Sequence, residues 1–573
     1  MSPKERKVYS VELTGSHGVD RSAFFGKNGW ERIENFRIDS SGALVKRPGR
    51  ERFSTPELSV TEAIPFVTQN EDGKPFDMLM LTPPYVTALD SETGETARYE
   101  RDLADDGRDM SLCIFRDRVY LSDANALKYF VPDRRYFLYE QGYAPLYGLA
   151  WDPQKRGPVH EEANLLSGRL RINYAVVGAA SSLDVGIKIK RVLRVEINGA
   201  QTTDFSVSGS LISGNFPEDS SVDVWVECQN EVNLGFASCH FSTVVGSGDG
   251  ERMVCFGSDV CRPMIYCSRP VSEKELEASR KGFSDSSELY FPASLAVRIG
   301  NLGQAVTALC GCNDGFAVFT ESGSFYASFE DKSLQCIPIS MSIGCAGRRG
   351  VMFKNGLIYT VCKHGIYVMD VDFDNPRSTK ISRLSDPIAG DADFCIVSGC
   401  TVSDNEKDGE IWFGFKESIY IYNLKFCNFF SYSFISSDFI MPHNGYMLLF
   451  YGNEIWKFRD DMFYDMIDGA ESPFTANART RWLDLDAPSS LKSGARIATV
   501  FDIEGGDRIM LGVETDTGLS KPYQMLHTRQ GRPKHLTVRV GRCRFSSLRF
   551  AITSYGQSRP KIFNLTVKAN SCD

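Results

Sequence analysis

The stretch from Cys310 to Phe458 repeats one short pattern four times, and this repeat constrains the fold more than any other feature of the chain. Each copy opens with an Asp-Gly or Asn-Gly step, which supplies the positive φ angles of a tight hairpin. Two short runs of aromatic and β-branched residues follow, separated by a second turn. The copies open at Asp314, Asn355, Asp408 and Asn444. The unit recurs at a loose period near the roughly 40 to 50 residues of a four-stranded blade, so it predicts a β-propeller.

A β-sandwich with several hairpins is the alternative fold. The strands of the repeat are almost continuously apolar, as in Leu357-Ile358-Tyr359 and in Met447-Leu448-Leu449-Phe450. Strands covered on both faces show such runs, whereas a strand with one wet face alternates apolar and polar residues. The pattern therefore favours the propeller.

Length and composition indicate several β domains. A chain of 573 residues is too long for one core, and Phe (38), Tyr (23) and Gly (49) are abundant while long helical patterns are few. The best helical candidate is Ser272–Lys281, where a Ser N-cap precedes acidic residues and the last turn is basic. We expect this short polar helix to decorate a loop.

The character of the strands divides this predicted all-β chain into five parts. Hairpins of the propeller type occur in residues 50–145 and 236–465, and we expect the first range to hold the first blades. A Pro-rich crossing leads into residues 146–235, which are predicted to form an inserted, sandwich-like β domain. Residues 466–573 alternate polar and apolar positions around Gly-rich turns and predict a C-terminal β-sandwich. Residues 1–49 form an N-terminal segment.

Several classes of site are not indicated. The cysteines number 16 and most lie inside apolar strands, which is typical of buried free thiols. The chain has no Cys-x-x-Cys, its seven histidines are scattered, and it lacks a Walker loop and a Gly-x-Ser-x-Gly motif. We therefore predict no metal, cofactor or catalytic residue.

No window reaches the roughly 18 apolar residues of a membrane span, and the polar start lacks a signal-peptide core, so we expect synthesis in the cytoplasm.

Charge is unevenly distributed along the chain. The formal net charge of −9 argues against a protein that grips nucleic acid over its whole surface. Residues 527–568, however, contain ten Arg or Lys and no acid. This basic run is either a solvated sheet face or a docking surface for an acidic partner. The candidates for assembly contacts within it are Arg539, Arg542, Arg544 and Arg549.

Two motifs resemble a known family. Asn35 is followed by Asp-x-x-Gly-x-Leu-x-x-Arg-Pro-Gly, which ends in Arg47, Pro48 and Gly49. This segment resembles the start of the tail-hub, tail-nozzle and packaged-DNA stabilisation (head-to-tail connector) proteins of short-tailed bacteriophages. Glu162-x-Asn164-Leu165-Leu166, followed by a β block, resembles the point at which those proteins insert a platform domain into their propeller.

The resemblance implies a structural virion protein of the phage tail and not an enzyme. Such subunits form a ring, usually a homohexamer, below the portal and adaptor ring and beside other tail proteins. The ring passes double-stranded DNA without sequence-specific binding and helps to retain the packaged genome. A lumen lined by carboxylates would let DNA slide, because it repels phosphate. Arg47, Pro48, Gly49 and Asn164 become candidate assembly residues by this resemblance.

A glycan-binding or glycan-hydrolysing propeller is the alternative function. A hydrolase of this kind needs paired carboxylates, which on a propeller would come from separate blades. The carboxylates of this chain are plentiful but show no distinctive spacing, so the sequence favours the structural role.

Overall fold

The structure is a computed structural model, and nearly all of its regular elements are strands. It describes residues 6–11, 30–70, 72–101, 103, 107–148, 161–228, 234–282, 287–313, 315–330, 333–388, 399–485, 489–503, 508–519, 523–525, 534–539, 544–557 and 559–571. The helical elements of these residues are α1 (Leu234–Ala237), α2 (Glu273–Arg280) and the 3-10 turns Gly248–Gly250, Ala293–Leu295, Pro376–Ser378 and Asp386–Ile388.

Seven four-stranded antiparallel units, which we call blades, make up the centre of the described chain. Blades 1 to 3 are β6 (Glu62–Gln69), β7 (Pro75–Thr82), β8 (Tyr85–Leu89) and β9 (Thr96–Arg101); β10 (Ser111–Phe115), β11 (Arg118–Ser122), β12 (Leu127–Val131) and β13 (Tyr136–Tyr139); and β22 (Cys239–Val245), β23 (Arg252–Ser258), β24 (Met264–Cys267) and β25 (Ala296–Arg298). Blades 4 and 5 are β26 (Val306–Cys312), β27 (Gly315–Thr320), β28 (Ser324–Glu330) and β29 (Ser333–Ser340); and β30 (Val351–Lys354), β31 (Leu357–Cys362), β32 (Gly365–Asp370) and β33 (Lys380–Arg383). Blades 6 and 7 are β34 (Thr401–Asn405), β35 (Glu410–Gly414), β36 (Ser418–Asn423) and β37 (Asn428–Ser433); and β38 (Phe439–His443), β39 (Tyr446–Tyr451), β40 (Glu454–Arg459) and β5 (Gly49–Ser54).

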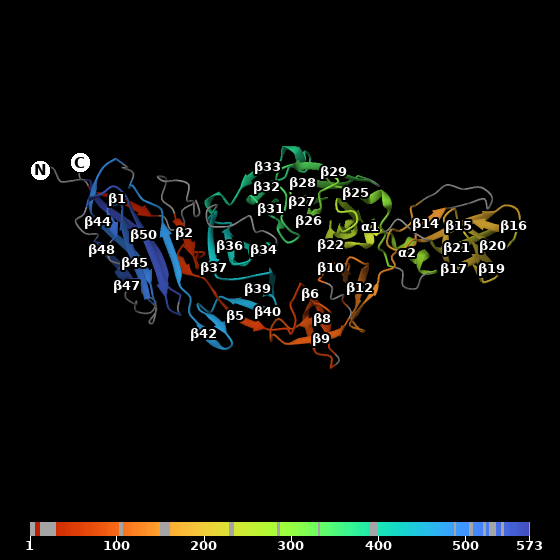
Figure 1. The fold of residues 1–573 in the computed structure, drawn as a ribbon, viewed down its shortest axis with the longest axis horizontal. Helices are drawn as coiled ribbons and strands as arrows, with labels where there is room; N and C mark the ends of the chain where they lie inside the picture. Colours follow the sequence, from red (N-terminus) through yellow and green to blue (C-terminus); the bar gives the residue numbers. More distant parts are fainter. Residues whose placement is uncertain are drawn as a thin grey trace.

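The blades stand in a ring, which Figure 1 shows in the middle of the molecule. The first strand of each blade contacts the first strand of the next, from β6 through β10, β22, β26, β30 and β34 to β38. An apolar cluster that includes Met80, Phe439 and Phe450 closes the ring between blades 7 and 1. The prediction of an all-β propeller is confirmed.

The N-terminal strand β5 completes the last blade and does not begin the first one. It pairs antiparallel with β40, where Phe458 lies opposite Arg50 and Arg459 opposite Gly49. The sequence led us to expect the first blades from residue 50, but the first blade starts at β6. Pairing between the two ends of the ring covers the outer edge of β40, which would otherwise offer unpaired backbone groups to solvent. The sheet continues beyond β5 with β41 (Asp465–Ile467) and β42 (Ala470–Ser472).

The turns that the repeat predicted lie between the first and second strands of their blades. Asn355 and Gly356 have φ angles of 53° and 80°, and Asn444 and Gly445 have 47° and 77°. Two consecutive positive φ angles are the hallmark of the tight hairpin turn that Asn-Gly favours. These two turns are confirmed, whereas at Asp408-Gly409 only Gly409 has a positive φ angle, 65°, and Asp314 of the first copy lies outside the described residues.

Between blades 2 and 3 the chain forms a small two-sheet domain, the inserted domain. One sheet has the order β14 (Leu146–Gly148), β15 (Arg169–Val176), β21 (Ser220–Cys228), β17 (Ile189–Ile197) and β18 (Ala200–Thr202), and the other β16 (Ala180–Asp184), β20 (Leu211–Phe216) and β19 (Phe205–Ser208). The core between the sheets contains Leu170, Tyr174, Val195, Phe216 and Val224, each at most 1% exposed. The inserted domain therefore has an apolar core of its own.

The C-terminal β-sandwich also has two sheets. Its outer sheet contains β3 (Phe36–Ile38), β4 (Leu44–Lys46), β51 (Lys561–Ser571), β44 (Lys492–Asp502) and β48 (Lys534–Arg539), with β1 (Arg6–Val11) and β49 (Arg544–Phe545) at its sides. Its inner sheet contains β2 (Trp30–Glu34), β43 (Ala476–Thr480), β50 (Leu548–Tyr555), β45 (Arg508–Thr515), β46 (Gly518–Leu519) and β47 (Tyr523–Met525). The inner sheet is continuous with blade 6, because Glu34 of β2 pairs with Ser431 of β37. The N-terminal segment thus supplies strands to both sheets.

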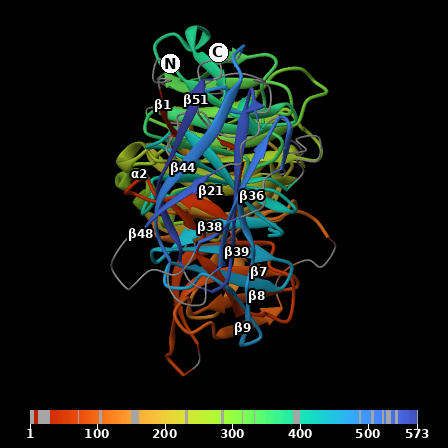
Figure 2. The same ribbon diagram turned by 90° about the vertical axis from the view of Figure 1, so that its left-hand side faces the viewer.

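The three β modules lie in a row. Figure 1 shows the propeller between the inserted domain on the right and the sandwich on the left, where both chain ends lie. Seen from the sandwich end, β1, β51, β44 and β48 of the outer sheet face the viewer (Figure 2).

Helix α2 begins at the predicted N-cap Ser272, whose side chain accepts from the Glu275 N–H in a capping box, so this helix is confirmed. No helix in the described ranges is long and apolar enough to cross a membrane.

Candidate functional site at the mouth of the propeller channel

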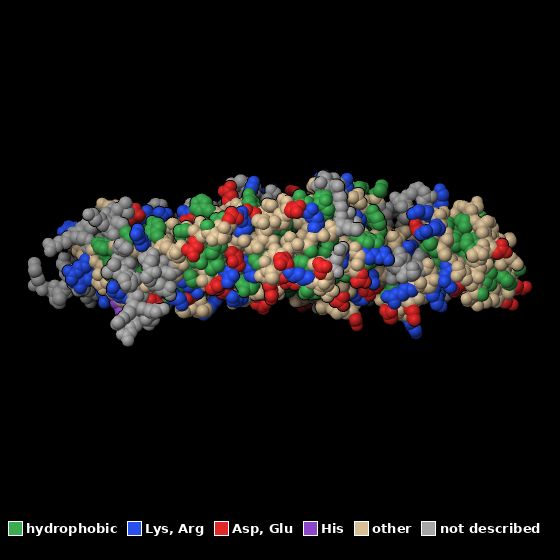
Figure 3. Space-filling model, turned by 90° about the horizontal axis from the view of Figure 1, so that it is seen from below, with side chains coloured by type: hydrophobic (Ala, Val, Ile, Leu, Met, Phe, Trp, Pro, Cys, Tyr) green, Lys and Arg blue, Asp and Glu red, His purple; other side chains and the backbone are tan. Residues whose placement is uncertain are grey.

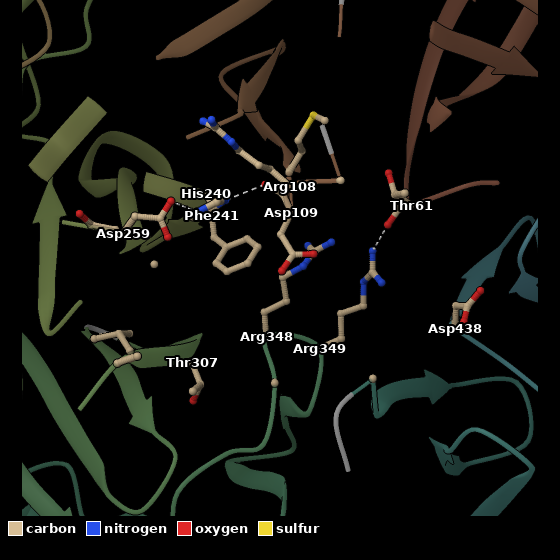
Figure 4. A pocket seen from close by; sticks show the side chains of 18 of the residues that line it. Thr61, Arg108, Asp109, His240, Phe241, Asp259, Thr307, Arg348, Arg349 and Asp438 are labelled. Atoms are coloured by element: carbon tan, nitrogen blue, oxygen red, sulfur yellow. Dashed lines mark hydrogen bonds and ion pairs between the residues drawn. The ribbon is translucent and has the colours of Figure 1, made fainter. Parts of the chain in front are cut away.

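A cavity of about 780 Å³ opens at one end of the propeller, where the first strands of the blades begin. We call it the channel mouth (Figure 4). Every blade contributes to its wall, because each first strand or the loop before it turns toward the axis. One lining residue from each of blades 1 to 7 is Thr61, Met110, His240, Thr307, Arg349, Cys400 and Asp438.

Two adjacent arginines, Arg348 and Arg349, cross the channel mouth from blade 5 to blade 1. Both bind the carboxylate Oε2 of Glu62, the first residue of β6, and the Arg349 Nη2 atom lies 3.0 Å from it. Arg349 Nη2 also donates to the Thr61 carbonyl at 2.6 Å. Blades 1 and 5 are not neighbours in the ring, so these contacts join opposite sides of the propeller, as Figure 4 shows.

Aromatic rings hold the planes of the two guanidinium groups. Arg349 lies over the Phe439 ring of blade 7 at 4.1 Å from its centroid, and Arg348 lies over Phe241 of blade 3 at 5.2 Å. Burial lowers the pKa of Arg349 to about 10, and the neighbouring Arg348 contributes in the same direction while Glu62 opposes it. Arg349 still carries its charge at neutral pH.

The opposite wall of the channel mouth carries an imidazole and two carboxylates. His240 Nδ1 lies 2.8 Å from the Asp109 carbonyl of blade 2, and its Nε2 lies 3.0 Å from Oδ2 of Asp259. The ring is thus fixed by a bond on each nitrogen. Among the described residues the Asp109 carboxylate has no ion pair, and Asp438 accepts only the Gly452 N–H, at 2.7 Å.

The channel mouth therefore presents charged groups of both signs to one cavity. Arg348 and Arg349 share one carboxylate, and their side chains are 22% and 24% exposed. The Asp109 side chain points toward the two arginines (Figure 4), and its charge acts on Arg349 although it forms no ion pair in the described chain. The contacts of Arg348 and Arg349 with blade 1 thus span the channel mouth.

Sequence reasoning missed this site because its residues come from seven separate loops. The only local signal is the Gly347-Arg348-Arg349-Gly350 step, in which two cations stand between two glycines just before a strand. A pair of adjacent arginines is common on protein surfaces, and the pairing of both with Glu62 becomes visible only in three dimensions.

The predicted residues Arg47, Pro48 and Gly49 lie where the N-terminal segment enters blade 7. Arg47 is 1% exposed, and its guanidinium binds both carboxylate oxygens of Asp465. The backbone N–H of Gly49 donates to the Met462 carbonyl at 2.7 Å, and a Cβ on Gly49 would collide with the Tyr464 carbonyl. These residues therefore make contacts inside one chain and are not free to face a neighbouring subunit.

Asn164 lies at the junction between the inserted domain and the propeller. Its side chain is fully buried and donates to the carbonyls of Tyr143 and Leu289, each at 2.9 Å. Its Oδ1 accepts from the N–H groups of Leu166 and Phe291, each at 3.1 Å. All four hydrogen-bonding positions of the amide are used within the chain.

The basic residues of the C-terminal run have different surroundings. Arg539 and Arg544 are exposed, while Arg549 is largely covered and pairs with Glu31 and Glu514. Arg542 lies outside the described residues. A further cation joins them from elsewhere in the sequence, because Arg496 of β44 lies opposite Arg539 on one side and opposite Lys568 on the other.

We call Arg539, Arg496 and Lys568 the basic row. Residues directly opposite on adjacent strands share one face of a sheet, and the neighbours of Arg496 in β44, Ala495 and Ile497, point into the core. The basic row consequently lies on the outer face of the sandwich, on the strands β48, β44 and β51 that face the viewer in Figure 2. Like charges side by side across strands destabilise a sheet. Over the propeller, by contrast, acidic and basic side chains are interspersed (Figure 3).

Comparison with known proteins leaves the family open. No protein-family model and no curated protein matches the chain. Among solved structures the chain is similar to apo AztD from Citrobacter koseri, at 10% identity, covering 65% of this chain and 86% of that one with a TM-score of 0.27. A putative 6-phosphogluconolactonase from Bacteroides fragilis matches at 10% identity, over 64% and 91% of the two chains, with a TM-score of 0.26. Similarities this weak carry no conclusion about function.

Proposed function

We propose that this protein is a structural subunit of the tail of a short-tailed bacteriophage. In this proposal identical subunits, six by the resemblance, form a ring below the portal and adaptor ring. The ring conducts double-stranded DNA, helps to retain it in the virion, and performs no catalysis. The proposal begins from the resemblance of residues 35–49 and 162–166 to tail-hub and nozzle proteins.

One observation carries the proposal: the residues that bear the resemblance hold the three β modules in a row. Arg47 joins the N-terminal segment to the strand that follows the last blade, through Asp465. Asn164 joins the inserted domain to the propeller through four backbone groups. A generic hairpin would not need a buried bidentate Arg or a fully satisfied buried Asn. The motif residues thus serve the architecture that the resemblance implies.

The channel mouth determines where DNA would pass in such a ring. Because Arg348, Arg349 and Glu62 form ion pairs across the mouth of the propeller, we place the lumen between subunits. A ring repeats one heterologous contact, in which two different surfaces of the subunit meet. An elongated subunit with separate β modules at its two ends has distinct surfaces available for this purpose (Figure 1).

The basic row is the surface that we assign to such a contact. Three cations in adjacent strands, with no acid paired to them in the described chain, disfavour the sheet that bears them. An acidic surface on a neighbouring subunit or ring would offset this repulsion and use the cations for specific docking.

The experiment compares assembly of the wild type with a double charge-reversal variant, Arg539→Glu with Arg544→Glu. Ring formation is followed by mass photometry and negative-stain imaging at low and high salt. We expect fewer rings for the variant, with a difference that shrinks in high salt, because exposed charges are screened beyond about 8 to 10 Å. The matched control is Arg377→Glu, which changes an exposed arginine of the propeller. Normal rings from the double variant would contradict the basic contact, and a wild type that stays monomeric at all concentrations would contradict the ring.

A glycan-active propeller is the second candidate, because the channel mouth brings carboxylates from three blades to one cavity. These are Asp109 of blade 2, Asp259 of blade 3 and Asp438 of blade 7. Asp259 is bound to His240 and Asp438 to the backbone of Gly452, so they do not form a facing pair. Hydrolysis of an oligosaccharide by the wild type, lost in an Asp109→Asn variant, would replace the structural proposal with this one.

A further inference from the structure

We propose that the channel mouth binds a small molecule with an oxyanion at one end and hydrogen-bond donors at the other. The oxyanion is a carboxylate or a phosphate, and Arg348 and Arg349 hold it. This site is independent of ring assembly and goes beyond the proposed structural role.

The donors for the oxyanion are the unused N–H groups of the two arginines. Each guanidinium has five N–H donors in a planar fork that fits a carboxylate or phosphate. In the described part of the chain, the hydrogen-bond acceptors of Arg349 are Glu62 Oε2 and the Thr61 carbonyl, both bound by Nη2. Arg348 shares the same Glu62 oxygen. The other edges of both guanidinium groups therefore remain available, and both side chains are partly open to the cavity.

The charge at this wall favours an anion. Within the described chain one carboxylate, Glu62, forms ion pairs with both guanidinium groups, and the charge of Asp109 acts on Arg349 without an ion pair. The repulsion between Arg348 and Arg349 contributes to the lowered pKa of Arg349. A bound oxyanion would offset this repulsion, and a charge-assisted bidentate contact is among the stronger hydrogen-bonding arrangements in proteins.

The site is held in place before any ligand arrives. Phe439 and Phe241 lie beneath the guanidinium planes at 4.1 Å and 5.2 Å, and Glu62 is itself 7% exposed at the start of β6. A ligand would not need to order these side chains, so little of its binding energy would be lost to immobilising them. The cavity of about 780 Å³ falls within the roughly 300 to 1,000 Å³ of small-molecule sites.

The opposite wall limits the kind of ligand. The Asp109 carboxylate has no ion pair in the described chain, and the Asp259 carboxylate pairs with His240, which also contacts the backbone carbonyl of Asp109. A polyanion would meet repulsion there. Hydroxyl or amine donors would instead be accepted by the carboxylate of Asp109. The two arginines and the Asp109 carboxylate together fit a molecule with one anionic end and several hydrogen-bond donors. Sugar acids, sugar phosphates and amino acids have this chemistry.

The test is isothermal titration calorimetry of the full chain with four probes: glucuronate, glucose 6-phosphate, acetate and glucose. We expect glucuronate or glucose 6-phosphate to bind more tightly than acetate, and neutral glucose to bind least. Comparing the first two probes distinguishes a carboxylate ligand from a phosphate ligand. Glucose binding equal to that of both anionic sugars would contradict the oxyanion assignment.

Variants place the binding at the channel mouth. Arg348→Gln and Arg349→Gln are each expected to raise the Kd of the anionic probes by about tenfold or more, since hydrogen bonds to charged groups contribute roughly 1.5 to 3 kcal/mol. Asp109→Asn should weaken the binding of glucuronate and leave the binding of acetate almost unchanged. The exposed Arg377→Gln is the matched control and should bind like the wild type. If Arg349→Gln unfolds because the cross-channel contact is lost, Arg348→Gln alone decides.

Two results would overturn the site: no binding of either anionic sugar by the folded wild type, or binding that neither arginine variant changes. Neither result depends on whether rings form, so failure of this proposal is distinguishable from failure of the proposed tail function.

Discussion

Arg47 and Asp465 form a bidentate ion pair inside the protein, with Nη1 2.9 Å from Oδ1 and Nη2 2.9 Å from Oδ2. The residues lie 418 positions apart in the sequence. Arg47 lies two residues before β5 and Asp465 opens β41, so the pair joins the two strands at the edge of blade 7. The Arg47 guanidinium also stacks on Phe474, 3.5 Å from the ring centroid. Closure of the propeller therefore depends on a polar contact as well as on strand pairing.

Replacing Arg47 by Ala should lower the free energy of unfolding by about 3 to 5 kcal/mol, because it leaves the buried Asp465 carboxylate without its main partner. Arg47→Lys keeps the charge but loses the planar fork, so we expect a smaller but clear loss. Urea unfolding followed by tryptophan fluorescence measures the effect. The control is Arg280→Gln, which breaks the pair with Glu273 between side chains that are 48% and 78% exposed, and should change stability by less than about 1 kcal/mol. A loss below about 1 kcal/mol for Arg47→Ala would contradict the assigned role.

The same pair predicts a sign for acid unfolding. Burial alone would raise the pKa of Asp465, but the guanidinium of Arg47 outweighs it and holds this pKa below its usual value. The pair therefore contributes its stability above the unfolded-state pKa, near 4, and loses it as the pH falls through the lower folded-state pKa. We expect Asp465→Asn to show a weaker loss of stability between about pH 4 and pH 2 than the wild type.

Replacing Asn164 by Ala should loosen the inserted domain. The change leaves two carbonyls and two N–H groups buried without the side chain that binds them, at a cost of roughly 2 to 4 kcal/mol. Asn164→Asp should be at least as harmful, because it turns a carboxylate oxygen toward the carbonyls of Tyr143 and Leu289. Hydrogen exchange is expected to speed up in β15 and β21 more than in the blades. Asn173→Ala, in the partly exposed part of β15, is the control.

The local features of the fold could be predicted from the sequence, because they depend on neighbouring residues. The Asn355-Gly356 turn and the capped helix at Ser272 are set by backbone preferences within a few positions. The apolar runs of the repeat indicated strands covered on both faces, which is how blades pack. Fold class followed from these features alone.

The remote contacts could not be predicted. The pairing of β5 with β40 joins residues about 400 positions apart, and nothing in the GRERFS segment distinguishes a closing strand from an opening one. The channel mouth presents the same difficulty, since Glu62 and Arg349 meet only when the ring has closed. The basic row includes Arg496 because of strand register, which the basic run itself does not reveal.

Glu410 should make the protein less stable as the pH rises toward neutrality. It is 1% exposed, and burial raises its pKa to about 7, although its Oε2 accepts from Trp412 Nε1 at 3.0 Å. Between the unfolded value near 4.5 and about 7, the folded state binds more protons than the unfolded one, so stability falls as the pH rises. A shift of this size corresponds to at most roughly 3 kcal/mol.

Glu410→Gln tests this directly, because glutamine keeps the acceptor oxygen for Trp412 without the charge. We expect the variant to unfold at higher urea than the wild type at pH 8 and at a similar concentration at pH 5. Glu417→Gln, at an exposed position of the same blade, should follow the wild type at both values. Parallel pH profiles for Glu410→Gln and the wild type would show that Glu410 does not control this dependence.

Phe434 stands out as an exposed aromatic residue in a strained backbone conformation. It follows the last strand of blade 6, its φ angle is 58°, and 90% of its surface is exposed. The left-handed region costs a residue other than Gly about 1 to 2 kcal/mol, and Asn tolerates this region better. Almost no apolar contact is lost on replacing a side chain this exposed. Phe434→Asn should therefore raise the free energy of unfolding by about 0.5 to 1 kcal/mol, whereas the β-branched Phe434→Val should lower it. Thermal and urea unfolding of the isolated subunit measure both variants. A stabilised Phe434→Val would contradict the assigned strain, because a β-branched residue is the least compatible with this φ angle.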